Sequence, residues 1–136
     1  MRFLTLLKTA EDVVGPPPAE LVTAMDEFQA ELAATGVLVS GAGLAPSTLG
    51  ARVRLSDGEL RVTDGPFAEA KELIVSYALL ELPSRADAVD LAARFLGLHR
   101  KYWDGWEGEA EIRPVVDRDD LEPEAWERKF GSDPTT

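Results

Sequence analysis

The spacing of apolar and polar residues predicts two strand-helix-strand units separated by a hairpin. Residues 2–7 alternate in the way that a β-strand requires. A proline-rich turn at 15–18 follows, and its last proline suits the first position of a helix. That helix extends to Gly36, and residues 37–39 begin the second strand. The apolar stripe of the helix consists of Leu21, Met25, Phe28 and Leu32.

A hairpin occupies the middle of the chain. Residues 51–55 and 60–62 alternate between apolar and polar, and the Asp-Gly pair at 57–58 supplies the turn. Asp-Gly favours a type I′ turn, in which both central residues have positive φ. With this two-residue loop, the register places Leu55 opposite Leu60 and Val53 opposite Val62.

The same register places Arg54 opposite Arg61 on the other face of the hairpin. Two like charges in this position repel each other. Two outcomes are consistent with the pattern. Either nearby acids such as Glu59 neutralise the pair, or the pair lines an anion site together with Arg52.

The longest apolar run covers residues 72–82, and both of its alternating faces are mainly apolar. A strand of this kind is buried on both sides. The two helices of the chain suffice to cover one side of a small sheet. Leaving the large side chains of the other side in water forgoes roughly 1.5–3 kcal/mol each. A second copy of the sheet is the simplest cover, so we expect an obligate homodimer.

The strand-helix-strand pattern recurs in the C-terminal half. Residues 86–96 form the second helix, which Gly97 is expected to end. Residues 98–108 are irregular and aromatic, and residues 110–116 form the last strand.

This order of elements predicts an α+β fold, a ferredoxin-like βαβ-hairpin-βαβ sandwich. We expect that domain to comprise residues 1–116. Residues 117–136 are rich in acids and prolines and are expected to form an acidic C-terminal tail.

The 136 residues carry 25 acidic and 14 basic side chains, a formal net charge of −11. Proteins that bind nucleic acid present a basic surface to the phosphates. We therefore expect neither nucleic acid nor a membrane among the partners. No apolar run approaches the ~20 residues needed to span a bilayer, and the start lacks the pattern of a signal peptide. The expected location is cytoplasmic.

The chain has no cysteine, and His99 is its one histidine. These counts exclude disulfides, thiolate chemistry and zinc sites that need cysteine or two imidazoles. The acids lack the spacing of a ligand set, and no glycine-rich phosphate loop precedes a helix. We expect neither a metal nor a cofactor.

Asp64 and His99 are the candidate catalytic residues. Asp64 precedes Gly-Pro, where its carboxylate either folds onto the following backbone N–H groups or acts as a base at the end of a strand. His99 is expected near a helix C-terminus, where a histidine commonly serves as a cap or surface group. As a general base it needs a carboxylate partner, for which Asp64, Asp104 and Glu107 are the candidates.

Six residues are candidates for binding a ligand. Arg113 either pairs with an acid such as Glu81 or binds a carboxylate. Phe67, Trp103 and Trp106 either anchor the structure or offer apolar contact to a small molecule. The six ligand-binding candidates are Arg52, Arg54, Phe67, Tyr77, Trp103 and Arg113.

The segment Asp64-Gly65-Pro66-Phe67-Ala68-Glu69 resembles the signature of the DGPF branch of the YCII-related proteins. Four further segments support the resemblance by their order: residues 36–44, the strand at 51–55 with its two arginines, Lys71-Glu72 and residues 111–115. The resemblance implies a ferredoxin-like domain whose sheets pack face to face in a dimeric α+β barrel. It also implies an association with extracytoplasmic-function sigma factors, and hence a regulatory role.

The chain departs from the family pattern at two places. The family commonly has Thr where this chain has Ala70. The classical YCII branch carries a histidine on the first helix, where this chain offers only Asp26 and Glu27. Acid–base chemistry proposed for that branch therefore does not transfer.

Three functions are consistent with these residues. The first is a small dimeric protein that binds an unidentified small molecule in a cleft between sheet and helices, in a sigma-factor-linked regulatory setting. The second is an acid–base lyase or isomerase that acts on a small organic acid through Asp64 and His99. The third is a structural or interaction module whose acidic tail docks on a partner.

Overall fold

A computed structural model describes residues 1–10, 12 and 15–131 of the chain. Its elements follow the order that the sequence predicts, with a short helical segment added at the end. The strands are β1 (Arg2–Thr9), β2 (Leu38–Gly43), β3 (Ala51–Ser56), β4 (Glu59–Asp64), β5 (Leu73–Glu81) and β6 (Glu109–Pro114). The helices are α1 (Ala19–Ala34), α2 (Arg85–Tyr102) and α3 (Pro123–Phe130), and the 3₁₀ turns are η2 (Ser47–Leu49) and η3 (Arg118–Leu121).

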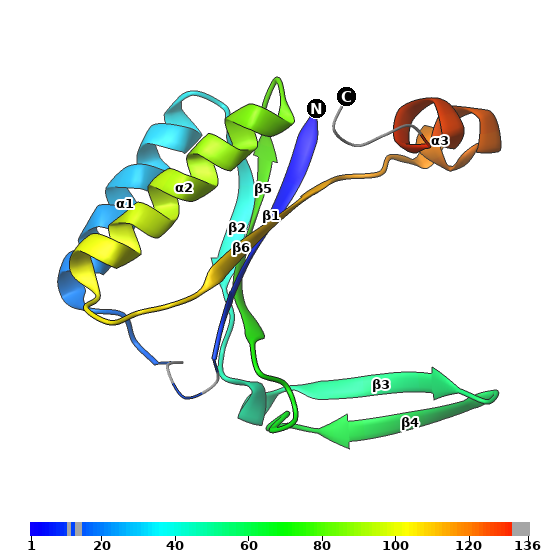
Figure 1. Cartoon of the computed structure of the whole chain (residues 1–136), viewed down its shortest axis with the longest axis horizontal. Coiled ribbons are helices and arrows are strands. Elements are labelled where there is room, and N and C mark those ends of the chain that lie inside the picture. Colours follow the sequence, from blue (N-terminus) through cyan, green and yellow to red (C-terminus); the bar gives the residue numbers. More distant parts are fainter. Residues whose placement is uncertain (11, 13–14, 132–136) are drawn as a thin grey trace.

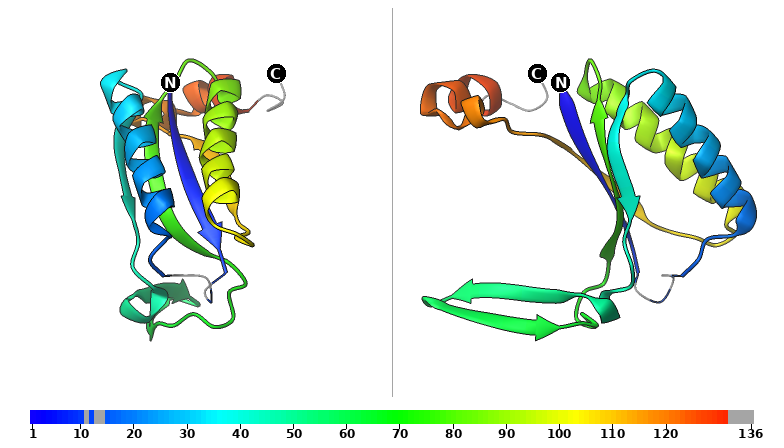
Figure 2. Two further views of the ribbon diagram at one scale, coloured as in Figure 1. Left: turned by 90° about the vertical axis from the view of Figure 1, so that its left-hand side faces the viewer. Right: turned by 180° about the vertical axis from the view of Figure 1, so that it is seen from behind.

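Four strands form an antiparallel sheet in the order β2-β5-β1-β6, and β3 and β4 form a separate two-stranded sheet. Helices α1 and α2 lie side by side on one face of the four-stranded sheet (Figures 1 and 2). Each helix connects two strands that are separated by one other strand in the sheet. The structure therefore confirms an α+β fold.

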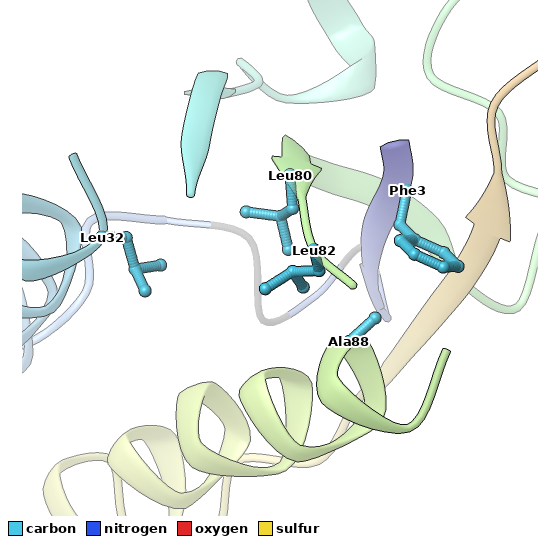
Figure 3. Close-up of a cluster of buried hydrophobic side chains, with 5 residues drawn as sticks. All are labelled: Phe3, Leu32, Leu80, Leu82 and Ala88. Carbon is cyan, nitrogen blue, oxygen red and sulfur yellow. The ribbon is translucent and has the colours of Figure 1, made fainter. Parts of the chain in front are cut away.

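The core lies between this sheet and the two helices. Alternate side chains of β1 point toward the helices, and Phe3 and Leu7 are buried there. Phe3 is paired with Leu80 of β5, so both side chains lie on the same face of the sheet. Figure 3 shows the cluster around them: Phe3, Leu32, Leu80, Leu82 and Ala88.

The hairpin of β3 and β4 has the predicted register and turn. Asp57 and Gly58 have φ values of 53° and 76°, as a type I′ turn requires. The hairpin projects away from the body of the protein (Figure 1). One of its faces carries four apolar side chains that are 66–71% exposed: Val53, Leu55, Leu60 and Val62.

The sheet face opposite α1 and α2 is not covered by a helix of the described chain (Figure 2). The β1–β5 register places Leu4 and Leu6 on this face, opposite Leu79 and Tyr77. All four side chains are half-buried. The prediction that the apolar run of β5 is buried on both faces is not met within one chain, because the helices cover only one side of the sheet and Ile74 is 44% exposed.

Helix α2 is longer than the sequence predicts. Gly97 was expected to end it, but the helix continues to Tyr102, and residues 98–102 are helical rather than irregular. The reason is that the face of the helix that packs on the sheet continues beyond Gly97, where His99 is buried. Burial of that face outweighs the local preference of glycine for a helix end.

The segment after β6 forms η3 and α3. Asp117 and Asp120 form a reciprocal capping box at the start of η3, and Lys129 of α3 donates to the Asp120 carboxylate at 3.1 Å. The rings of Trp126 and Phe130 lie 5.0 Å apart on α3. A domain boundary after residue 116 stays a prediction. None of the helices in the described residues is long and apolar enough to cross a membrane.

Candidate functional site

A cavity of about 330 Å³ lies between the two long helices and the sheet. Helix α1 contributes Met25 and Phe28, and helix α2 contributes Leu91, Phe95 and His99. The loop after α2 contributes Trp103 and Trp106. Most of the wall is therefore apolar or aromatic, which is typical of sites for small organic molecules.

Small residues on the sheet create the space for this cavity. Gly41 and Gly43 of β2 are paired with Ala78 and Ser76 of β5, and all four line the cavity. An added Cβ at Gly41 would approach the Tyr77 carbonyl oxygen to 3.1 Å, so a larger residue is tightly restricted there. With little side-chain volume on this part of the sheet, the helices above it leave a gap that larger residues would fill.

A chain of aromatic rings runs along one wall of the cavity. Phe28 of α1 lies 5.8 Å from Phe95 of α2, between ring centroids. Phe95 contacts the imidazole of His99 edge-on at 4.9 Å, and that imidazole lies 4.5 Å from the ring of Trp106. This wall holds His99 between two apolar rings, and its side chain has few rotamers available.

His99 is a buried imidazole in the wall of the cavity. It is only 3% exposed, because α2 continues past Gly97 and turns the side chain inward. The expectation of a cap or surface group is therefore wrong. Its Nδ1 lies 3.0 Å from the carbonyl oxygen of Phe95. A carbonyl only accepts, so Nδ1 carries the proton and donates, which leaves Nε2 as an acceptor.

Burial lowers the pKa of His99, and the hydrogen bond to the Phe95 carbonyl opposes this only in part. The imidazole is thus neutral near pH 7. Among the described residues that line the cavity there is no Asp, Glu, Lys or Arg. Asp64, Asp104 and Glu107, the predicted carboxylate partners of His99, are not part of the wall.

Three residues of the sheet with aliphatic hydroxyl groups also line the cavity: Thr5, Thr9 and Ser76. The Thr9 Oγ1 donates to the Glu107 carbonyl oxygen at 2.8 Å. The Thr5 Oγ1 atom is buried, and no group of the described chain makes a hydrogen bond to it. Leaving a buried hydroxyl unpaired costs about 1–3 kcal/mol. Ser76, from the neighbouring strand, is half-buried and lies opposite Leu7 of β1. Sequence reasoning missed Thr5 and Ser76, and their only signal was a small hydroxyl residue at a core-facing position of an apolar strand.

Residues 64–67 occupy a different part of the molecule, at the base of the hairpin. The Gly65 N–H donates to the Gly50 carbonyl oxygen at 2.9 Å, and the Phe67 N–H donates to the Ser47 Oγ at 3.3 Å. An added Cβ at Gly65 would lie 1.6 Å from the Ser47 carbonyl oxygen, so only glycine fits at this position. The segment therefore links the base of the hairpin to the η2 turn through hydrogen bonds and close packing.

Comparison with known proteins identifies the family of the chain. The family model described as "YCII-related domain" matches residues 1–95 of the chain. The chain belongs to the YCII-related family. An uncharacterised protein of Rhizobium meliloti (strain 1021) is similar to it, with 34% identity over 92 residues, which are 68% of this chain and 70% of that protein. The match ends before His99, Trp103 and Trp106, so these three cavity residues lie outside the matched segment.

In this YCII-related protein, two of the three predicted ligand-binding arginines, Arg52 and Arg113, are engaged with other side chains. The Arg52 guanidinium lies over the Phe67 ring, 3.9 Å from its centroid, and also pairs with Glu69. Arg52 and Phe67 line a second, more open hollow between the hairpin and β5. Arg54 is opposite Arg61, as predicted, and Glu59 lies 3.5 Å from Arg61. Glu59 therefore offsets the charge of Arg61, and an anion site at Arg52 and Arg54 stays a prediction.

Arg113 does not pair with Glu81. Its guanidinium lies 3.4 Å from Glu111 on the same strand. Glu81 instead contacts the N-terminal ammonium group at 3.1 Å and Arg2 at 3.0 Å, because β5 lies directly beside the start of β1. These contacts hold the pKa of Glu81 below its ordinary value. The Tyr77 hydroxyl lies 3.4 Å from Ser40, on the uncovered face of the sheet.

The predicted site residues thus divide between separate regions. His99, Tyr77 and Trp103 line the cavity, whereas Arg52 and Phe67 line the second hollow. Asp64, Arg54 and Arg113 line neither of these two spaces in the described chain. Within the described residues, no group of three or more His, Asp or Glu side chains is placed to hold a metal ion.

Proposed function

We propose that this YCII-related protein binds a mainly apolar small molecule in the cavity between its helices and its sheet, and that it does so as a homodimer. The observation that carries the proposal is the cavity itself, with its aromatic wall and a few convergent polar groups. Its volume of about 330 Å³ falls within the range of small-molecule sites. A core that served stability alone would gain from filling this volume.

The uncovered surfaces of the single chain support the homodimer. An isolated two-stranded hairpin is marginally stable in water, yet this one exposes two apolar cross-strand pairs. A second apolar surface, around Leu6 and Leu79, lies on the uncovered face of the sheet. The hairpin and α3 project beyond that face at its two ends, so the chain is concave there (Figure 1).

A second copy of the chain is the occupant that fits this concave side. Two sheets packing face to face would cover the apolar residues of both copies, and each hairpin could pack on the other subunit. Two ferredoxin-like halves would then form the dimeric α+β barrel that the resemblance to the DGPF branch implies. A sigma-factor-linked regulatory role stays a prediction from that resemblance.

The acid–base enzyme is the weaker alternative. It requires a carboxylate that can exchange a proton with His99 directly or through one water. Among the described residues, the Phe95 carbonyl oxygen is the one group that is hydrogen-bonded to this ring, and no carboxylate lines the cavity around it. Binding without turnover therefore accounts better for the cavity.

The cavity can be tested by filling it. Ala92 of α2 is buried and lines the space, so Ala92→Leu would occupy part of it. Ala93 is the exposed next residue of the same helix, and Ala93→Leu serves as the matched control. We expect small aromatic compounds to raise the melting temperature of the wild-type protein and of Ala93→Leu, and to have little effect on Ala92→Leu. Equal shifts in all three proteins would overturn the proposal.

A further inference from the structure

The cavity contains groups that distinguish between classes of ligand. We infer that its ligand is an uncharged aromatic molecule with a hydroxyl group, and that this hydroxyl donates a hydrogen bond to Nε2 of His99. The inference deepens the proposed function and rests on it, since both concern the same cavity.

The orientation of His99 decides which ring nitrogen is available. The Nδ1 edge faces the backbone of its own helix, where the N–H donates to Phe95. The ring therefore presents its opposite edge, with Nε2, to the cavity that it lines. No group of the described residues makes a hydrogen bond to Nε2. Unlike Thr5 Oγ1, which is also unpaired, Nε2 is not fully enclosed by protein. An acceptor with open space beside it calls for a donor on the ligand.

The charge of the wall excludes ionised ligands. Apart from His99, no described lining residue directs a titratable side chain into the cavity, because the Tyr77 hydroxyl lies on the uncovered face of the sheet. A carboxylate, phosphate or ammonium group would lose its hydration there without gaining a countercharge. A phenolic or alcoholic hydroxyl is uncharged near neutral pH and loses much less on entering the cavity.

The remaining polar groups favour a hydroxyl over other neutral donors. A hydroxyl donates one hydrogen bond and accepts others, so it can serve the imidazole acceptor and a protein hydroxyl together. Ser76 brings such a hydroxyl to the sheet side of the cavity, whereas the Thr5 oxygen is enclosed. The rings of Phe95 and Trp106 on either side of His99 suit a planar aromatic body.

Three bicyclic compounds of similar size separate the effect of a hydrogen-bond donor from the effect of a charge: 2-naphthol, 2-methoxynaphthalene and 2-naphthoate. The methoxy compound lacks the donor, and the carboxylate adds a charge. Binding can be measured at pH 7.5 by isothermal titration calorimetry and by quenching of tryptophan fluorescence, since Trp103 and Trp106 line the cavity. We expect 2-naphthol to bind about ten-fold more tightly than 2-methoxynaphthalene, the value of one hydrogen bond, and 2-naphthoate to bind most weakly.

The variant His99→Phe replaces the imidazole by an aromatic ring without an acceptor. We expect it to bind 2-methoxynaphthalene as the wild type does and to lose the preference for 2-naphthol. The variant Asp64→Asn is the control, because Asp64 is exposed at the base of the hairpin, and it should keep the full preference.

The possible outcomes separate this inference from the proposed function. If the wild type binds 2-naphthol and 2-methoxynaphthalene equally, the cavity still binds ligands but the hydroxyl inference is wrong. If 2-naphthoate binds most tightly, the inference is also wrong, because a charged ligand is preferred. If none of the three compounds binds, both the inference and the proposed function fail. A preference that persists in His99→Phe would contradict the role of His99.

Discussion

The segment at residues 64–67 and the cavity around His99 differ in how visible they are in the sequence and in what they do. The segment is the most distinctive part of the sequence, yet its backbone is used to fasten the hairpin to the η2 turn. The cavity is built from common core residues, glycines and alanine, and has no sequence motif. A recognisable motif can therefore mark local structure, and we propose that the ligand binds elsewhere, in the cavity.

This difference has a physical basis. A loop in which two backbone segments approach each other tolerates few residue types, and Gly65 is an instance because a side chain there would overlap Ser47. A cavity wall tolerates many apolar residues of suitable size. Only its polar groups, such as His99 and Ser76, need specific atoms.

The largest expected effect is the loss of the dimer when the apolar face of the hairpin is changed. In the double variant Leu55→Glu with Leu60→Lys, two facing apolar residues become an opposite-charge pair, which keeps the hairpin favourable and removes part of its apolar face. We expect the molar mass in light scattering to fall from twice the chain mass of 14.8 kDa to that mass. The variant should retain ligand binding in the cavity.

Arg54→Glu is the control for this experiment, since Arg54 lies on the opposite face of the same hairpin. It should leave the dimer intact. A wild-type protein that is monomeric at micromolar concentration, or a double variant that stays dimeric, would refute the role of the hairpin in assembly.

A smaller but still substantial effect is expected at the signature segment. Gly65→Ala forces either the loop or the η2 turn to move, because the new Cβ would overlap the Ser47 carbonyl oxygen. We expect the free energy of unfolding to fall by about 3 kcal/mol in urea titrations. Gly97→Ala is the matched control: its Cβ meets open space in a helix interior, so it should gain about 0.5–1 kcal/mol. Equal changes in the free energy of unfolding for the two substitutions would show that the segment is not tightly packed against the η2 turn.

The smallest effect concerns the protonation of His99. Burial lowers the pKa of this side chain from its ordinary value of 6.5, so the unfolded chain binds a proton more readily than the folded one. The stability that the neutral imidazole confers is present above that ordinary value and is lost as the pH falls through it. The slope cannot exceed about 1.4 kcal/mol per pH unit for one proton.

Urea unfolding between about pH 5 and 7 measures this loss, and His99→Phe should flatten the profile. Ion pairs or hydrogen bonds lower the pKa values of acidic groups such as Glu81 and Asp120. These groups therefore change the stability mainly at lower pH, outside the range in which His99 titrates. A wild-type profile that is equally flat would mean that His99 is solvated and not held in the cavity wall.

Local rules predicted some parts of the fold well. The Asp57-Gly58 turn determined the register of the hairpin, because a two-residue type I′ loop leaves only one pairing. The alternation in residues 2–7 and the stripe on the first helix likewise identified β1 and α1. The family followed from the Asp-Gly-Pro-Phe segment together with the order of the other motifs.

Other parts depend on tertiary contacts that no local rule describes. Gly97 is a common end signal, but the helix continues because His99 and the rings beyond it pack inward. The cavity arises because Gly41 and Gly43 come to lie beside Ala78 and Ser76, from a strand more than thirty residues away in the chain. The candidate site was consequently predicted only in part, through His99, Tyr77 and Trp103.

The central claim is that the cavity around His99, and not the region around residues 64–67, holds the ligand. A crystal structure of the protein soaked with 2-naphthol tests it most directly. We predict the compound between the helices and the sheet, with its oxygen about 2.7–2.9 Å from Nε2 of His99. Density for the compound beside Arg52 and Phe67, with the cavity empty, would contradict the claim.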